Sequence, residues 1–174
     1  MEKILIIVDM QKDFVDGSLG TKEAQAIVPE VKKKIENFDG DIIFTKDTHG
    51  GDYMSTQEGQ NLPIPHCIKE TAGHEIIEEL QPYIKKSLAV FEKETFGSRK
   101  LANFLKELHK EKEIESIELI GLCTDICVVS NALLIKAFLP EVPISVDSKC
   151  CAGVTPEKHE SALEVMRSCQ IVIW

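Results

Sequence analysis

The chain has 174 residues, a formal net charge of −9 at pH 7 and an isoelectric point near 5.1. This length suits one domain with a sizeable core, and we expect that domain to extend over residues 1–174. The acidic balance argues against nucleic acid or an anionic membrane as a partner. Because no segment has the pattern of a membrane span or a signal peptide, we expect a cytoplasmic protein.

Short apolar runs alternate with segments of helical periodicity along the chain. We expect strands over residues 3–8, 41–45, 87–91, 117–122, 143–146 and 170–174. We expect helices over residues 27–38, 74–80, 98–109, 124–138 and 156–167, the second of which stops before Pro82. Continuous apolar runs are typical of strands covered on both faces. The alternation therefore predicts a three-layer α/β domain with a mostly parallel sheet.

Residues 50–71 show neither a helical nor a strand period. They contain Gly50, Gly51, Gly59, Pro63 and Pro65. Ordered loops of this length are uncommon inside compact domains unless they bind something. We therefore expect a functional loop here.

The residues from 117 to 129 predict a buried strand, a break at Gly121 and a helix capped by Thr124. Cys127 then lies in the first helical turn, where the helix dipole lowers the pKa of a thiol. The free backbone donors of that turn could hold an oxyanion. From position alone, a buried structural thiol is the more common alternative for Cys127. The six cysteines otherwise predict reduced packing residues, since the chain is not small and carries no mark of secretion.

Reactive side chains follow the ends of four predicted strands. Asp9, Lys93 and Cys127 form one group, and Asp47 and His49 form another. Right-handed crossovers bring such strand ends to one edge of a parallel sheet, where ligands bind. An acid, a lysine and a cysteine can act together, because the lysine stabilises a thiolate and the carboxylate moves its proton. The Asp-x-His pair suits a divalent ion, although an Asx-turn beside a solvated histidine is the simpler alternative.

Several motifs together resemble the isochorismatase-like cysteine hydrolases, and within them the nicotinamidases. The motifs are Val8-Asp9-Met10-Gln11-x-Asp13-Phe14, Thr45-Lys46-Asp47-x-His49, Lys93, and Gly121-x-x-Thr124-Asp125-Ile126-Cys127-Val128, in the family's order. The resemblance implies a six-stranded parallel sheet of order 3-2-1-4-5-6. It also implies a catalytic triad of Asp9, Lys93 and Cys127. A cis peptide before Cys123 is implied too, with the backbone N–H groups of Cys123 and Cys127 forming an oxyanion hole.

The same resemblance implies one divalent metal ion held by Asp47, His49 and His66. One more protein ligand differs in residue type among nicotinamidases, and we expect Glu58 to be that ligand here. Zinc is the first expectation, and iron and manganese also suit this ligand set. The ion would bind and polarise the pyridine nitrogen of the substrate.

The resemblance implies that Phe14 lines the substrate pocket, although local packing is an equal alternative. Many nicotinamidases place a tryptophan against the ring, and residues 62–65 contain none. Tyr53 and Phe96 are the candidates to replace it. The remaining histidines, His74, His109 and His159, are expected to be solvated.

We therefore expect hydrolysis of nicotinamide to nicotinate and ammonia through a cysteine thioester. Isochorismatases proper lack the metal loop, and their reaction needs no thiol. One alternative is an amidase for another small amide, ureide or carbamoyl compound. Another is a non-catalytic binding member of the fold. The resemblance also implies a small-molecule substrate and a homo-oligomer.

Overall fold

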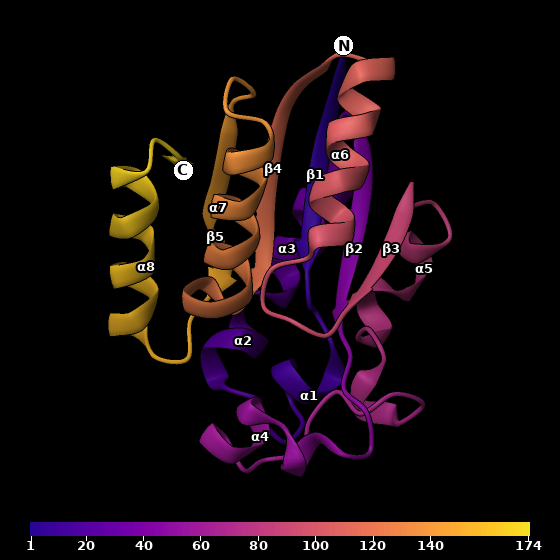
Figure 1. Ribbon diagram of the computed structural model, residues 1–174, viewed down its shortest axis with the longest axis vertical. Helices are drawn as coiled ribbons and strands as arrows, with labels where there is room; N and C mark the ends of the chain where they lie inside the picture. The colour runs from indigo at the N-terminus through magenta and orange to yellow at the C-terminus, as the bar shows by residue number, and fades with distance from the viewer.

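The computed structural model describes residues 1–174 as a six-stranded parallel sheet between two layers of helices (Figure 1). The strands are β1 (Glu2–Val8), β2 (Asp41–Asp47), β3 (Ala89–Lys93), β4 (Ile114–Leu122), β5 (Ile144–Ala152) and β6 (Val172–Ile173). Their order is 3-2-1-4-5-6, and every neighbouring pair is parallel, as predicted. The strand order reverses between β1 and β4, which is where ligands bind in sheets of this kind.

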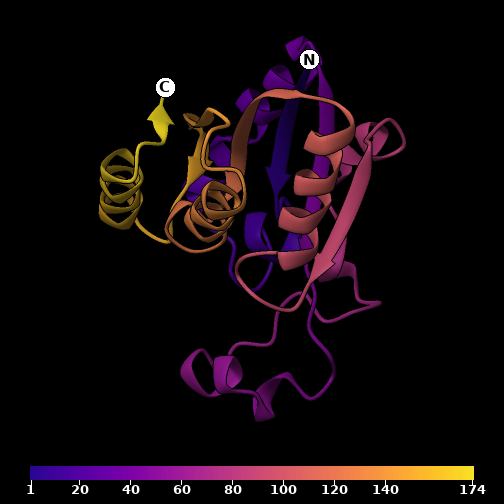
Figure 2. The same ribbon diagram turned by 45° about the horizontal axis from the view of Figure 1, so that its top comes forward.

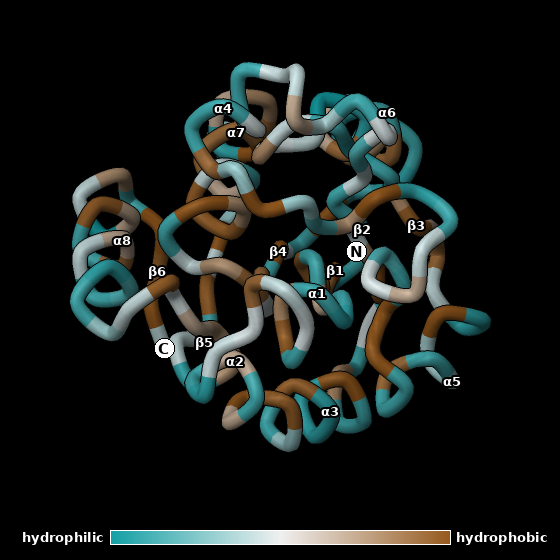
Figure 3. Tube along the Cα trace, turned by 90° about the horizontal axis from the view of Figure 1, so that it is seen from below, coloured by the Kyte–Doolittle hydropathy of each residue, from teal (hydrophilic) through white to brown (hydrophobic).

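Helices cover both faces of the sheet, as the view along the strands shows (Figure 3). They are α1 (Lys12–Val15), α2 (Lys22–Ala26), α3 (Val28–Asn37), α4 (Gln57–Asn61), α5 (Gln81–Ile84), α6 (Arg99–Glu111), α7 (Val129–Phe138) and α8 (Pro156–Ser168). The helices α6, α7 and α8 lie on one face, and α3 and α5 lie on the other. None of them is long and apolar enough to cross a membrane.

The central strand β1 is apolar from Ile4 to Val8 because both of its faces are covered there. Ile4, Ile6 and Val8 belong to the core on the side of α6 and α7. Leu5 and Ile7 belong to the second core, under α3. All five side chains are fully buried, which explains the continuous apolar run in the sequence.

Two of the predicted helices differ from the structure. The segment around residues 22–37 forms two helices, α2 and α3, with Thr21 capping the first through the N–H of Ala24. The predicted helix over 74–80 is wrong. That segment contains the 3₁₀ turns Ala72–His74 and Glu78–Leu80, and α5 follows with Pro82 in its first turn. The first turn needs no donor from proline, so Pro82 begins a helix instead of ending one.

The segment between β2 and β3 projects beyond the carboxyl ends of the strands, below the sheet in Figure 2. Its first part, residues 50–71, contains two short elements, the 3₁₀ turn Tyr53–Ser55 and helix α4. Thr56 caps α4 by accepting a hydrogen bond from the N–H of Gly59 at 3.0 Å. The expected functional loop is therefore ordered by its own caps and turns.

Gly121 allows β4 to approach β1 at the carboxyl edge. Its φ is +116°, and a Cβ atom built there would lie 2.2 Å from the carbonyl oxygen of Val8. Any other residue would meet both the strained backbone and the neighbouring strand.

We expect Gly121→Ala to lower the free energy of unfolding by about 3 kcal/mol, through strain and overpacking. Urea titration followed by far-UV circular dichroism measures this change. Gly51→Ala is the matched control, because nothing lies within 4 Å of a Cβ built there. Equal losses in the two variants would show that the close contact with Val8 does not limit this position.

Candidate active site

Three buried side chains meet at the carboxyl edge of the sheet: Asp9 after β1, Lys93 at the end of β3 and Cys127 after β4. The ammonium nitrogen of Lys93 lies 2.6 Å from Oδ2 of Asp9 and 3.4 Å from Sγ of Cys127. The lysine side chain reaches past the end of β2, the strand that separates β3 from β1. The structure thus brings together the three residues of the predicted triad.

The backbone of Asp9 directs its carboxylate toward Lys93. Its φ is +47°, in the left-handed region that aspartate enters more readily than most residues. The hydroxyl of Thr45 donates a hydrogen bond of 2.6 Å to Oδ1 of Asp9. The N–H of Asp9 donates to the carbonyl of Thr45 at 3.2 Å. One carboxylate oxygen is therefore fixed by β2, and the other contacts the lysine.

Burial has the largest effect on the pKa values of Cys127 and Asp9. Burial raises the pKa of Cys127 well above that of an ordinary thiol; Asp9 raises it further, and Lys93 opposes the rise. Burial also raises the pKa of Asp9 against the opposing effect of Lys93. The predicted lowering of the Cys127 pKa is therefore wrong, because burial and a neighbouring carboxylate outweigh the opposing charge of Lys93. A protonated thiol then lies in a group whose carboxyl has become a better proton acceptor.

Lys93 keeps its proton in this environment. Burial alone would lower its pKa, but Asp9, Cys127 and Asp47 together raise it well above the ordinary value. A permanent positive charge therefore lies between the carboxylate of Asp9 and the sulfur of Cys127.

The chain between β4 and α7 forms a tight turn around Cys123. The peptide bond from Leu122 to Cys123 is cis, as the family resemblance implied. A π-helical turn over Thr124–Val128 follows, and the Cys123 carbonyl accepts hydrogen bonds from the N–H groups of Ile126 and Val128. This turn places Cys127 at the end of a cavity, just before α7 begins at Val129.

The predicted capping role of Thr124 is wrong. Cys123 holds the N-cap position, and no side chain caps the turn. The hydroxyl of Thr124 is 2.7 Å from Nδ1 of His159 on α8 instead. Thr124 is fully buried, so its hydroxyl needs a partner within the protein, and the adjacent helix provides one.

Asn131 supports the turn that contains Cys127, and the sequence analysis missed it. Its amide donates to the carbonyl of Cys127 at 2.8 Å and to that of Phe96 at 3.1 Å, and its oxygen accepts from the N–H of Ser98 at 2.9 Å. Asn131 is fully buried. A lone asparagine within the apolar helix 124–138 was the available signal, since a buried amide requires several partners.

The four predicted metal ligands, Asp47, His49, Glu58 and His66, also come together. One ligand atom from each lies within 4.8 Å of every other. Nε2 of His49 is 2.8 Å from Oδ2 of Asp47, and Oε1 of Glu58 is 3.6 Å from Nε2 of both histidines. Nδ1 of His66 contacts the carbonyl of Ile64 at 2.8 Å, which leaves its Nε2 facing the group. Two imidazoles and two carboxylates form a donor set that could hold zinc or a similar divalent ion.

Asp47 connects the two groups. Its Oδ1 lies 3.3 Å from the ammonium of Lys93, while its Oδ2 faces His49 and His66. Burial alone would raise the pKa of Asp47, but hydrogen bonds from the histidines and the charge of Lys93 hold it well below its usual range. Asp47 is therefore a carboxylate anion shared by the lysine and the ligand group.

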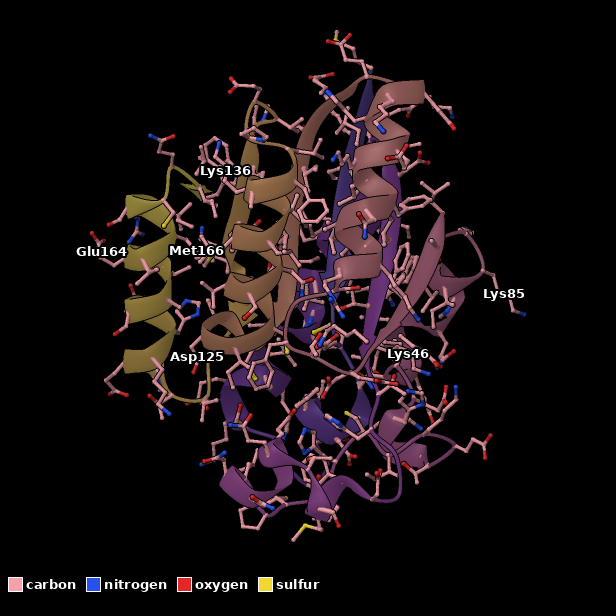
Figure 4. The ribbon with its side chains drawn as sticks, in the orientation of Figure 1. Lys46, Lys85, Asp125, Lys136, Glu164 and Met166 are labelled. Carbon is pink, nitrogen blue, oxygen red and sulfur yellow. The ribbon has the colours of Figure 1, made fainter.

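A cavity of about 1060 Å³ joins the thiol to the ligand group. Cys127 and Cys123 line it, as do the four ligands and the predicted pocket residues Phe14 and Phe96. Asp125 lies at the lower end of α7 in Figure 4, and its carboxylate accepts a hydrogen bond from the N–H of the cavity residue Val154 at 2.9 Å. The cavity thus opens at the edge where the strand order reverses.

Tyr53 does not line this cavity, contrary to the sequence-based prediction. Its ring packs behind the ligands, with its centroid 4.8 Å from that of His49 and 5.0 Å from that of His66. The hydroxyl donates to the carbonyl of Leu62 at 2.9 Å, which holds the ring in the loop's own core. Tyr53 is therefore a support for the histidines.

The three other histidines are less exposed than expected, and partly buried His109 accepts a hydrogen bond from the N–H of Ile114 at 3.0 Å. His74 is buried, with Nε2 2.8 Å from the hydroxyl of Thr48, so the expectation of a solvated side chain is wrong. His159 is partly buried against Thr124. Helical periodicity could not reveal the contacts of His74 and His159, because both join segments far apart in the sequence.

A model of the isochorismatase domain matches residues 3–173, and the chain belongs to the isochorismatase family of hydrolases. It is similar to a nicotinamidase of Schizosaccharomyces pombe, with 28% identity over 97% of this chain and 91% of that protein. It is also similar to the pyrazinamidase of Pyrococcus horikoshii in complex with zinc, with a TM-score of 0.82 and 28% identity over 100% and 99% of the two chains. N-carbamoylsarcosine amidase from Thermoplasma acidophilum matches with a TM-score of 0.76 and 26% identity over 99% and 95%.

We expect Lys93→Gln to slow the alkylation of Cys127 by iodoacetamide at pH 8 by about tenfold, the effect of one further pKa unit on the thiol. The reason is that the variant removes the cation 3.4 Å from the sulfur. Mass spectrometry of the Cys127 peptide against time measures the rate. Lys69→Gln is the control, because its ammonium pairs with Glu92 at the surface. An unchanged rate in Lys93→Gln would contradict this account of the thiol.

Proposed function

We propose that this protein is a nicotinamidase, which hydrolyses nicotinamide to nicotinate and ammonia. The observation that carries the proposal is that one cavity contains both the Cys127 thiol and a two-histidine, two-carboxylate ligand group. Similarity to a nicotinamidase and to a zinc-containing pyrazinamidase supports it. A binding protein without catalysis would have no need for a buried lysine between two carboxylates and a thiol.

In the first half of the reaction, Asp9 accepts the proton of Cys127, and the sulfur attacks the amide carbon. The backbone N–H groups of Cys123 and Cys127 stabilise the oxyanion of the tetrahedral intermediate. The intermediate collapses to a thioester as the C–N bond breaks, and Asp9 returns its proton to the leaving ammonia. Lys93 remains protonated throughout and keeps the site's charge balanced.

In the second half, Asp9 accepts a proton from water, and the hydroxide attacks the thioester carbon. The C–S bond breaks, the proton on Asp9 returns to the sulfur, and the nicotinic acid formed loses its own proton to solvent and leaves as nicotinate. Asp9 thus serves as base and acid in turn, which suits a carboxyl whose pKa burial has raised.

Asp47, His49, Glu58 and His66 would hold one divalent ion, with zinc the first candidate. When bound, the ion would bind the pyridine nitrogen and draw electron density from the ring and its carboxamide. The ligand residues themselves orient the substrate, because they face the same cavity as Cys127.

We expect Cys127→Ala to lower ammonia release from nicotinamide by at least about 10³-fold, because no other group can form the thioester. An enzyme-coupled ammonia assay measures this loss, and circular dichroism checks that the variant folds. Cys169→Ala, at an exposed free cysteine, is the control and should keep full activity. Substantial turnover by Cys127→Ala would rule out the thiol mechanism.

Removal of the metal should abolish ammonia release from nicotinamide, and added zinc should restore it. The alkylation of Cys127 should continue in the chelated protein, because its lysine and carboxylate remain in place. Full activity after verified chelation, with metal content measured by elemental analysis, would contradict the role assigned to the ligand group.

The cavity also favours a second candidate, an amidase for another small amide, ureide or carbamoyl compound. Its volume of about 1060 Å³ exceeds the space that a single pyridine ring needs, and no tryptophan covers it. Similarity to N-carbamoylsarcosine amidase agrees with this candidate. Absence of ammonia release from nicotinamide, with a reactive Cys127, would favour it over the nicotinamidase.

A further inference from the structure

Two polar side chains in the loop after β1, Gln11 and Asp13, point to the metal-ligand segments and not into the cavity. Gln11 is fully buried, and Asp13 is partly buried on α1. Neither takes part in the steps described above. Their hydrogen bonds go to backbone groups of the proposed ligand Asp47, of His74, and of Cys67, the residue after His66.

Gln11 holds the backbone of Asp47 on both sides. Its side-chain oxygen accepts a hydrogen bond from the N–H of Asp47 at 2.7 Å, and its amide donates to the carbonyl of Asp47 at 2.8 Å. The same amide donates to the carbonyl of His74 at 2.9 Å. The side chain thus pairs with Asp47 as a neighbouring strand would, just where β2 ends.

Asp13 acts in the same way on Cys67, the residue that follows His66. Its Oδ2 accepts a hydrogen bond of 2.7 Å from the N–H of Cys67, whose φ is +47°. The carbonyl of Cys67 accepts in turn from the N–H of His49 at 2.9 Å. One carboxylate therefore fixes the residue that connects the two histidine ligands.

The Asp13 carboxylate has little freedom to move. A Cβ built at Gly73 would lie 2.1 Å from its Oδ2, so the glycine leaves room for the carboxylate and for nothing more. The fourth ligand, Glu58, belongs to α4, whose cap comes from Thr56 within the same loop. The loop after β1 therefore holds three of the four ligands, and the fourth is ordered separately.

We propose that Gln11 and Asp13 are positioning residues that pre-organise Asp47, His49 and His66 for metal binding. The inference rests on the metal site of the proposed function. Ligands on irregular backbone lose conformational freedom when they bind an ion, and hydrogen bonds that fix them beforehand increase the affinity. Because Asp9 directly follows β1, the same segment of chain sets the position of the metal group relative to the carboxylate of the proposed triad.

The test is the zinc dissociation constant of the full-length, metal-free protein, measured by competition with a chromophoric chelator. Asp13→Ala should bind zinc about 10- to 100-fold more weakly, as when a supporting hydrogen bond of a metal site is lost. Asp13→Asn keeps an acceptor oxygen and should lose only about threefold, since neutral hydrogen bonds are weaker than charge-assisted ones. This rescue separates a lost acceptor from a general defect.

Thr155→Ala is the matched control, because it also removes one side-chain acceptor of a backbone N–H, that of Lys158, at the far helix α8. It should lose stability without loss of zinc affinity. If Asp13→Ala fails to fold by circular dichroism, Asp13→Glu, which displaces the carboxylate by one methylene, replaces it and should also bind zinc about tenfold more weakly.

The outcomes separate this inference from the proposed function. Suppose that the wild-type protein binds zinc and the folded Asp13 variant binds it with the same dissociation constant. This result would overturn the positioning role and leave the proposed metal site standing. Wild-type protein that binds no zinc would overturn the metal site and the positioning role together. The expected result is weaker zinc binding by Asp13→Ala, partial recovery of affinity in Asp13→Asn and unchanged affinity in Thr155→Ala.

Discussion

The buried ammonium group of Lys93 is the interaction on which the site depends. It contacts carboxylates from two other strand ends, Asp9 and Asp47, and lies beside the sulfur of Cys127. Removing one partner of such a buried group would leave uncompensated charge in a medium of low polarity, which is costly. The lysine therefore joins the thiol and the metal-ligand group into one electrostatic unit, in addition to any role in the reaction.

The sheet gives this unit its rigidity. Parallel strands with both faces covered end at one edge, so side chains from β1, β2, β3 and β4 arrive there on fixed backbone. The long segment after β2 has little regular structure, yet it supplies three of the four proposed ligands. It can do so because Gln11 and Asp13 hold its ends by hydrogen bonds, and the ring of Tyr53 packs against its two histidines.

In the proposed reaction Cys127 is the nucleophile, and the free protein holds it as a thiol. Burial and Asp9 keep the proton on Cys127, while Asp9 itself is held between a lysine that favours its charge and an environment that opposes it. Small changes when a substrate enters could then move the proton between sulfur and carboxylate. A carboxyl of raised pKa suits this alternation better than an ordinary exposed aspartate.

Local patterns in the sequence determined much of this protein. The apolar runs located all six strands, and the family resemblance of the motifs implied the sheet order, the cis peptide at Cys123 and the proposed ligand residues that the fold brings together. Only the tertiary structure decided the raised pKa of Cys127, the burial of His74, the position of Tyr53 behind the ligands and the roles of Gln11 and Asn131 in bonding. Periodicity and capping report on residues close in the chain, whereas burial, charge and hydrogen-bond partners arise between segments that only folding brings into contact.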